Sequence, residues 1–139
     1  MPNNVNSLTF PKAEKLCSKR IIEQIYERGK KIKSYPFILN YLEVGPDFEM
    51  AFPVQIATAV PKRRVKLAVK RNRLKRQIRE AYRLHKSGMI EDVVAEDKRL
   101  ALFLLYIGKE PESYHFIEKK LILLLDSLRV QLKQKTNED

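Results

Sequence analysis

The segment from Pro61 to Lys86 constrains this chain more than any other, because it combines concentrated charge with helical apolar spacing. It contains twelve Lys and Arg residues and one acid, Glu80, which gives it a net charge of +11. The whole protein has the same formal net charge of +11, so the rest of the chain is neutral in sum. Within the segment, an apolar stripe recurs at helical spacing: Leu74, Ile78, Ala81, Tyr82 and His85. The pattern predicts a helix over about residues 67–86, with one face on a core and cations on the others.

This charge predicts a polyanionic partner, because each phosphate contact releases condensed counterions. The alternative is a solvated charged helix that has no partner. Solvated helices usually alternate charge signs, whereas here only Glu80 offsets twelve cations, and this favours a partner. Anionic lipid is a poorer partner, because the basic helix lacks the large aromatic and leucine face that anchors a helix in a membrane interface.

The remaining composition predicts one domain over residues 18–133, between an N-terminal arm (1–17) and a polar C-terminal tail (134–139). With 139 residues and 44% hydrophobic residues, the chain can bury a core of ordinary size. The single cysteine, Cys17, cannot form an internal disulfide, which is typical of a reducing cytosol. No signal peptide and no membrane-spanning run is visible, so we expect a cytoplasmic protein.

The other expected elements follow from periodicity and turn signals. Ser18 is a suitable N-cap for a helix over residues 18–28, and Gly29 lies at its C-cap, where positive φ is favoured. A weak short strand (31–33) precedes strands at 36–44 and 50–60, joined by the turn at residues 45–47. A short helix (89–98), a strand covered on both faces (100–107) and a final helix (112–133) complete the chain. The sum is an α+β fold, an α/β sandwich with three main helices on a central mixed sheet, in the order α-β-β-(β)-α-β-α.

No catalytic constellation is visible in the sequence. Cys17 has no evident partner, His85 lies on the apolar stripe, and His115 opens the last helix. No spacing of Cys and His suits a metal, and the acids at 91–92 and 96–97 are typical of a solvated helix face. With only four glycines the chain has no phosphate-binding loop. We therefore expect a binding surface, no catalytic residues in the protein and no metal held by it.

The run AVKRNRLKR at residues 68–76, followed by IREAYR at 78–83, resembles the signature of the bacterial ribonuclease P protein subunit. The similarity continues in IYERGK at 25–30 and YPFIL at 35–39, and it covers about residues 10–132. Two departures are visible. Many members have a glycine in the loop before the signature, which here reads KRRVKL at 62–67, and many have an aromatic residue where this chain has Ile22.

The resemblance implies the small subunit of a ribonucleoprotein that removes the 5′ leader from precursor tRNA. In that family the RNA subunit is the catalyst and binds the Mg²⁺ ions, so the protein would hold no cofactor itself. The partners would be the catalytic RNA and precursor tRNA. The family's fold implies a left-handed crossover through the basic helix, which is rare in general.

Two sets of site residues are expected. The resemblance places the basic loop and helix against the catalytic RNA: Lys62, Arg63, Arg64, Lys66, Lys70, Arg71, Asn72, Arg73, Lys75, Arg76 and Arg79. It places the single-stranded leader in a cleft between the first helix and the sheet: Ile22, Tyr26, Phe37, Leu39 and Tyr41. From the residues alone, Phe37 and Leu39 fit either the cleft or the core, whereas Tyr26 and Tyr41 are expected at the surface.

Two other classes of protein compete with this interpretation. One is a non-enzymatic RNA-binding module, such as a ribosomal protein or an RNA chaperone. The other is a DNA-binding protein that places the basic helix in the major groove. The RNRLKR run at residues 71–76 favours the ribonuclease P interpretation over both.

Overall fold

The computed structural model describes residues 14–45 and 52–138, with side chains as far as residue 133. Within these ranges lie four helices and four strands. In chain order they are α1 (Lys19–Arg28), β1 (Lys30–Ser34), β2 (Phe37–Glu43), β3 (Val54–Ala59), α2 (Ala68–His85), α3 (Ser87–Ala95), β4 (Leu100–Tyr106) and α4 (Tyr114–Glu138). The predicted elements are confirmed, including the weak strand β1 and the short helix α3. Met50 and Ala51, at the start of the predicted second strand, lie outside the described residues.

The strands form one mixed sheet in the order β1-β2-β4-β3. β1 pairs with β2 and β2 pairs with β4 in antiparallel fashion, whereas β3 and β4 are parallel. β4 is central and its residues are buried on both faces, as its unbroken apolar sequence predicts. β1 and β3 are the two edges.

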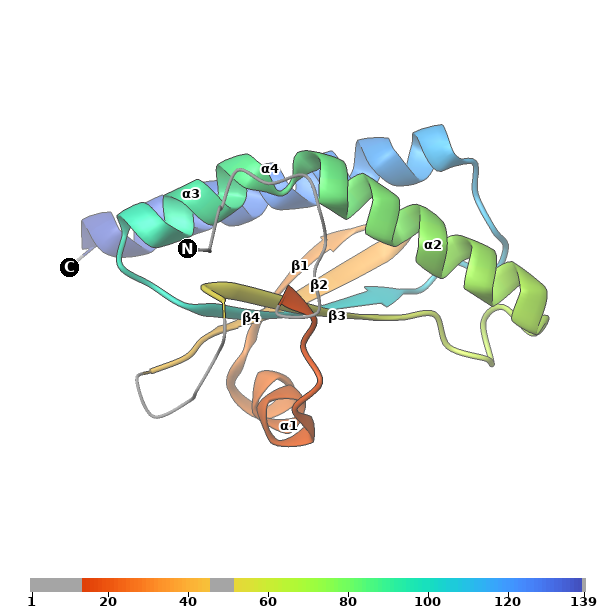
Figure 1. Cartoon of the computed structure of the whole chain (residues 1–139), viewed down its shortest axis with the longest axis horizontal. Helices are drawn as coiled ribbons and strands as arrows, with labels where there is room; N and C mark the ends of the chain where they lie inside the picture. The colour runs from red at the N-terminus through yellow and green to blue at the C-terminus, as the bar shows by residue number, and fades with distance from the viewer. Residues whose placement is uncertain (1–13, 46–51, 139) are drawn as a thin grey trace.

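Helices cover the two faces of this sheet unequally (Figure 1). α2, α3 and α4 lie together on one face, where they enclose the main core with side chains such as Phe37, Leu102 and Leu128. α1 lies alone on the other face, where Ile21 and Ile25 pack against a smaller cluster that includes Ala101 and Phe103. A single ten-residue helix is too short to cover a four-stranded sheet, so part of this second face stays half-exposed.

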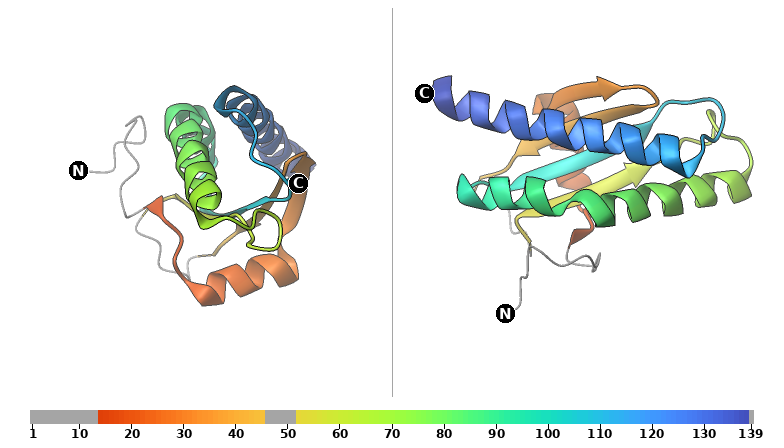
Figure 2. Two further views of the ribbon diagram at one scale, coloured as in Figure 1. Left: turned by 90° about the vertical axis from the view of Figure 1, so that its right-hand side faces the viewer. Right: turned by 90° about the horizontal axis from the view of Figure 1, so that it is seen from above.

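The connection from β3 to β4 is a left-handed crossover through α2 and α3. Figure 2 shows it from above: β3 and β4 run in the same direction, and α2 returns over the near face of the sheet. This confirms the expected left-handed crossover. Because α2 follows β3, and β3 and β4 are parallel, the start of α2 lies at the end of the sheet where both strands finish, next to the loop that leads into α4.

α1 begins and ends as its sequence predicts, but its final glycine has another role. The Ser18 hydroxyl accepts a hydrogen bond from the backbone N–H of Ile21 at 3.3 Å, which caps the first turn. Gly29 follows the last helical residue with φ −77°, so the expectation of a positive φ is wrong. A Cβ at this position would lie 2.5 Å from the carbonyl oxygen of Ile25 and 2.8 Å from that of Tyr41. Glycine is therefore required by the close approach of two backbones.

The junction between α2 and α3 is almost continuous. α2 ends at His85 and α3 begins at Ser87, with Lys86 between them in helical conformation at φ −77° and ψ −24°. Gly88 lies inside α3. There a Cβ would come within 2.5 Å of the Arg129 guanidinium. Arg129 itself donates to Asp92 at 2.7 Å and so joins α4 to α3.

Residues before α1 are attached to the body of the domain. Lys15 pairs with Ile56 as an isolated bridge, and the Leu16 N–H donates to the Ile56 carbonyl at 2.9 Å. Glu14 forms an ion pair with Lys86 in which the ammonium lies 2.6 and 2.7 Å from the two carboxylate oxygens, and both side chains are buried. Residues 1–13 of the predicted arm lie outside the described part of the chain.

At the other terminus, α4 continues to Glu138, so the predicted boundary at residue 133 falls inside a helix. Among the described residues, no helix has both the length and the apolar character needed to cross a membrane.

Candidate nucleic-acid interface

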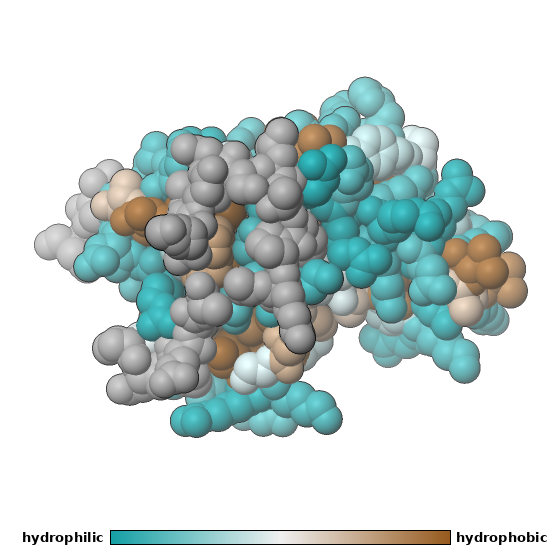
Figure 3. Space-filling view, in the orientation of Figure 1, coloured by the Kyte–Doolittle hydropathy of each residue, from teal (hydrophilic) through white to brown (hydrophobic). Residues whose placement is uncertain are grey.

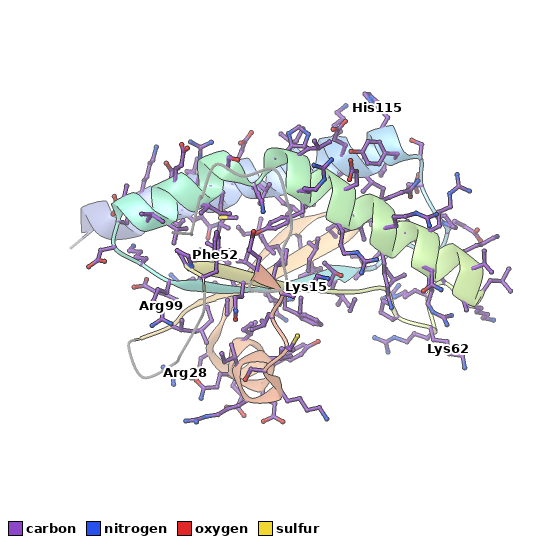
Figure 4. All side chains as sticks on the ribbon, viewed as in Figure 1. Lys15, Arg28, Phe52, Lys62, Arg99 and His115 are labelled. Atoms are coloured by element: carbon purple, nitrogen blue, oxygen red, sulfur yellow. The ribbon has the colours of Figure 1, made fainter. Side chains whose placement is uncertain are left out.

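The basic residues form one continuous surface along the β3–α2 loop and the outer side of α2. Figure 4 shows Lys62 in this loop, below the start of α2. The loop is folded by backbone hydrogen bonds from Arg64 and Val65 to the Pro61 carbonyl, at 3.0 and 3.1 Å. Val65 is buried, so the loop is tied to the core while its cations point outward. Below, "basic surface" means the exposed predicted residues: Lys62, Arg63, Lys66, Lys70, Asn72, Arg73, Arg76 and Arg79.

α2 presents these residues because its apolar stripe is fixed in the core. Leu74, Ile78, Ala81 and Tyr82 are buried, as their spacing predicts. His85 is half-buried and its Nε2 lies 2.8 Å from a carboxylate oxygen of Glu118 on α4, so it serves packing between the helices. The rigid inner face holds the outer cations at fixed spacing along about five turns of helix.

Arg64, Arg71 and Lys75 are the three predicted contacts that are partly buried. Arg71 has an evident structural role: its Nη1 donates to the carbonyls of Val65 and Lys66, at 3.0 and 2.8 Å. Arg71 thus clamps the loop to the first turn of α2. The position of Arg71 within the signature run thus has a structural role in the loop.

The start of α2 strengthens the positive field of the basic surface. Leu67 occupies the N-cap and provides no side-chain hydrogen bond, and the first turn contains no acid. The backbone N–H groups there carry the positive end of the helix dipole, which attracts anions. Glu80, the one acid in the segment, is paired with Arg83 at 2.7 Å, and this hydrogen bond lowers the pKa of Glu80.

A second surface is the sheet face that α1 partly covers. Below it is called the α1 face, and by strand alternation it comprises Lys31, Lys33, Ile38, Asn40, Leu42, Gln55, Ala57, Ala59, Ala101, Phe103 and Leu105. Tyr26 projects from α1 beside it, 56% exposed, with its ring 5.5 Å from the ring of Phe103 at an interplanar angle of 64°. Ile22 is half-buried one turn earlier on α1 and packs on the same cluster. Lys31 and Lys33 place two cations at the β1 edge of this surface.

The structure separates the residues that the sequence grouped in one cleft. Phe37, Leu39 and Tyr41 point to the opposite face of β2, into the main core, where they are 0%, 1% and 7% exposed. The expected surface position of Tyr41 is therefore wrong: its hydroxyl donates to Gln131 on α4, and burial raises its pKa. Only Ile22 and Tyr26 of that set remain beside the α1 face.

Sequence reasoning missed Asn40 and Phe103. The Asn40 amide donates to the Phe103 carbonyl at 3.3 Å, which joins β2 to β4 under Tyr26. A polar residue in the middle of an apolar strand was the available signal for Asn40. Phe103 gave none, because every residue around it in β4 is apolar.

No catalytic cluster accompanies these surfaces in the described part of the chain. No group of three or more His, Cys, Asp or Glu residues within residues 14–45 and 52–138 could hold a metal ion. Cys17 is exposed. Figure 4 shows His115 at the start of α4, directed away from the sheet and far from Lys62.

Residues 10–125 match the sequence profile of a family described as Ribonuclease P. The chain belongs to this ribonuclease P protein family. The match includes the β3–α2 loop, the signature run on α2 and the whole sheet.

Two curated relatives agree with the family assignment. The ribonuclease P protein component of Porphyromonas gingivalis is 32% identical over 111 residues, which cover 79% of each chain. That of Chlorobium phaeobacteroides is 33% identical over 137 residues, which cover 91% of each chain. Family membership makes this chain a protein component of the holoenzyme that processes tRNA 5′ ends.

Solved structures of ribonuclease P proteins share the fold. That of Staphylococcus aureus superposes with a TM-score of 0.65 at 20% identity, over 83% of this chain and 94% of that chain. That of Thermotoga maritima gives a TM-score of 0.60 at 25% identity, over 81% and 94%. The α+β sandwich with its left-handed crossover is thus the fold of the family.

Proposed function

We propose that this ribonuclease P protein binds the catalytic RNA of the holoenzyme through its basic surface, and the 5′ leader of precursor tRNA along its α1 face. The observation that carries the proposal is the placement of nearly all excess charge on one rigid loop and helix, beside a second surface suited to single strands. The alternative of a solvated charged helix is disfavoured by the family, whose members act in a ribonucleoprotein.

The basic surface suits a folded RNA because four of its eight residues are arginines. The planar guanidinium grips phosphate oxygens through two parallel hydrogen bonds, whereas lysine acts as a point charge. Arg73, Arg76 and Arg79 recur every three residues along α2, so they can follow phosphates over almost two turns of the helix. Asn72 can both donate and accept a hydrogen bond at the same surface.

The α1 face suits a single strand. Tyr26 supplies an exposed ring on which a base can stack, and the half-buried side chains of Ile38 and Leu105 supply an apolar floor. Lys31 and Lys33 lie at the edge, where a phosphate backbone would pass. Aromatic platforms with nearby cations bind single strands with little sequence preference, which fits leaders of varied sequence.

In this proposal the RNA subunit holds the Mg²⁺ ions and performs the hydrolysis. The protein contributes position: it fixes the leader relative to the RNA and adds positive potential where two polyanions meet. The reaction would take place in the cytoplasm, and the single cysteine of the sequence agrees with a reducing compartment.

The test is cleavage of a 5′-labelled precursor tRNA at low Mg²⁺. The protein alone, a bacterial ribonuclease P RNA alone and the two together are compared at equal ionic strength. We expect rapid release of an intact leader only from the mixture. Cleavage by the protein alone would contradict RNA catalysis, and a mixture no faster than the RNA would contradict the subunit role.

If the mixture shows no gain while the protein still binds structured RNA with a steep salt dependence, a general RNA-binding module becomes the better interpretation. Preference for duplex DNA over structured RNA would instead favour a DNA-binding protein. Both measurements use the same purified protein.

A further inference from the structure

A pocket of about 590 Å³ opens at the end of the sheet where α2 begins. It lies between the β3–α2 loop and the loop that joins β4 to α4. Its lining residues are Arg63, Arg64, Val65, Lys66, Leu67, Lys70, Lys109, Glu110 and Pro111. Residues 109–111 are outside the predicted RNA-binding set, so the fold adds a wall that the signature run does not include. The volume lies within the range of about 300–1,000 Å³ that is typical of small-molecule sites.

The lining of this pocket combines two chemistries. Cations come from both walls: Arg63, Lys66 and Lys70 from one, Lys109 from the other. Apolar surface comes from Leu67 and Pro111. Leu67 is 60% exposed although it lies in the most charged part of the molecule. In Figure 3 the end of the molecule where α2 begins shows apolar side chains surrounded by hydrophilic ones.

A surface that contacts only phosphates needs no apolar pocket, because phosphates are gripped by exposed cations and backbone N–H groups. A nucleotide needs both chemistries: a charged site for its phosphate and an apolar surface for the face of its base. Protein contacts that recognise an RNA sequence are made mostly with unpaired nucleotides, whose bases are not stacked in a helix. The carboxylate of Glu110, the single acid of the lining, repels phosphate and so favours an orientation with the phosphate toward the loop cations.

We infer that this pocket holds one unpaired nucleotide of a bound RNA, with its base against Leu67 and Pro111 and its phosphate among Arg63, Lys66, Lys70 and Lys109. This inference rests on the proposed function, since it assumes that the basic surface meets RNA. It adds a specific subsite to a surface that would otherwise recognise only backbone charge.

The decisive comparison is Leu67→Ser against Val69→Ser. Val69 is 80% exposed, two residues from Leu67 on the first turn of α2, and does not line the pocket. Serine at the N-cap position of Leu67 can cap the helix, so this variant keeps or gains stability. A thermal melt of each variant checks that both fold.

The first arm measures binding of a labelled ribonuclease P RNA by filter retention over a salt series. We expect Leu67→Ser to raise Kd roughly fivefold to tenfold with the salt slope unchanged, because the lost contact is apolar. Val69→Ser should stay within about twofold. Lys109→Met should raise Kd and reduce the salt slope by about one.

The second arm measures binding of precursor and mature tRNA to the assembled RNA–protein complex. A Leu67→Ser defect in the first arm assigns the nucleotide to the catalytic RNA. If Leu67→Ser weakens binding only in the second arm, and only for precursor tRNA, the nucleotide in the pocket belongs to the leader. If Leu67→Ser and Val69→Ser have the same affinities in both arms, the pocket inference is overturned and the basic surface contacts phosphates alone. Wild-type protein that fails to bind the RNA would overturn the proposed function, and this inference with it.

Discussion

The buried ion pair between Glu14 and Lys86 gives the sharpest prediction for stability. Lys86 lies at the α2–α3 junction and Glu14 precedes α1, so the pair ties the segment that leads into α1 to the helices on the opposite face of the sheet. Removing one partner of a buried pair leaves an uncompensated charge and costs about 3–5 kcal/mol. Lys86→Met keeps most of the side-chain volume and removes only the charge. We therefore expect Lys86→Met to lower the free energy of unfolding by about 4 kcal/mol at pH 7.

Urea unfolding followed by circular dichroism measures this loss. With a slope of about 2 kcal/mol per molar, typical of a domain of this size, the midpoint should fall by about 2 M. Lys119→Met, which removes an exposed lysine from α4, is the matched control and should change stability by less than about 0.5 kcal/mol. The double variant Glu14→Gln with Lys86→Met removes both charges and should be more stable than Lys86→Met alone.

The pH dependence separates this mechanism from simple loss of packing. Burial raises the pKa of Glu14, and the hydrogen bond and charge of Lys86 oppose that rise. Without Lys86 the pKa of Glu14 rises further, so the folded variant binds a proton more readily than the unfolded chain. Protonation of Glu14 then stabilises the folded variant at low pH. This contribution is lost as pH rises through the folded-state pKa of Glu14 and is recovered as pH falls. Lys86→Met should regain stability relative to wild type as the pH falls from 7 toward the ordinary Glu pKa of 4.5, whereas the double variant should not. A loss below about 1 kcal/mol, or no recovery in acid, would refute the argument.

Three further predictions concern RNA and the loop. If about six phosphates are neutralised, the logarithm of the binding constant for the catalytic RNA should fall with log salt at a slope of about −4 to −5. An affinity that does not change with salt would contradict the predicted phosphate contacts. Tyr26→Ala should weaken precursor tRNA binding to the holoenzyme about tenfold and leave mature tRNA unaffected, because a stacked base contributes about 1–3 kcal/mol. Tyr35→Ala, at the same 56% exposure but in the β1–β2 turn, is its control, and equal loss for both tRNAs would exclude a leader contact. Arg71→Met should lower stability by about 1–3 kcal/mol in urea through the two lost carbonyl contacts. Arg76→Met, an exposed change, should reduce RNA affinity alone, and the reverse pattern would mean that the loop clamp has been misassigned.

The elements were predictable where one physical signal was strong. α2 has a clear stripe at helical spacing, and β4 is apolar throughout, so their type and depth followed from pattern. Which residues of β2 point to which face of the sheet could not be predicted in this way. Its sequence, FILNYLE, is apolar at both odd and even positions, because one face meets the main core and the other meets α1. Alternation could not show that Phe37, Leu39 and Tyr41 point away from Tyr26.

The candidate sites depended on contacts between distant parts of the chain. The basic surface is local in sequence and was found from charge alone. The pocket brings Lys109 and Pro111 against the β3–α2 loop, and the ion pair joins residues 72 positions apart. Gly29 looked like a residue chosen for its φ, and only the backbone approach of Ile25 and Tyr41 explains it. Such features are set by topology, and the left-handed crossover itself was expected only from the family.

The sheet has two edges, and both are protected against aggregation. An exposed strand edge offers unpaired backbone groups to any other chain, and natural proteins block it with lysines or cover it. β1 carries Lys30, Lys31 and Lys33 along one edge. β3, at the other edge, is covered at Ile56 by residues 15 and 16, which the Glu14–Lys86 pair holds in place. One buried ion pair thus helps to close a sheet edge that β3, unlike β1, does not protect with lysines.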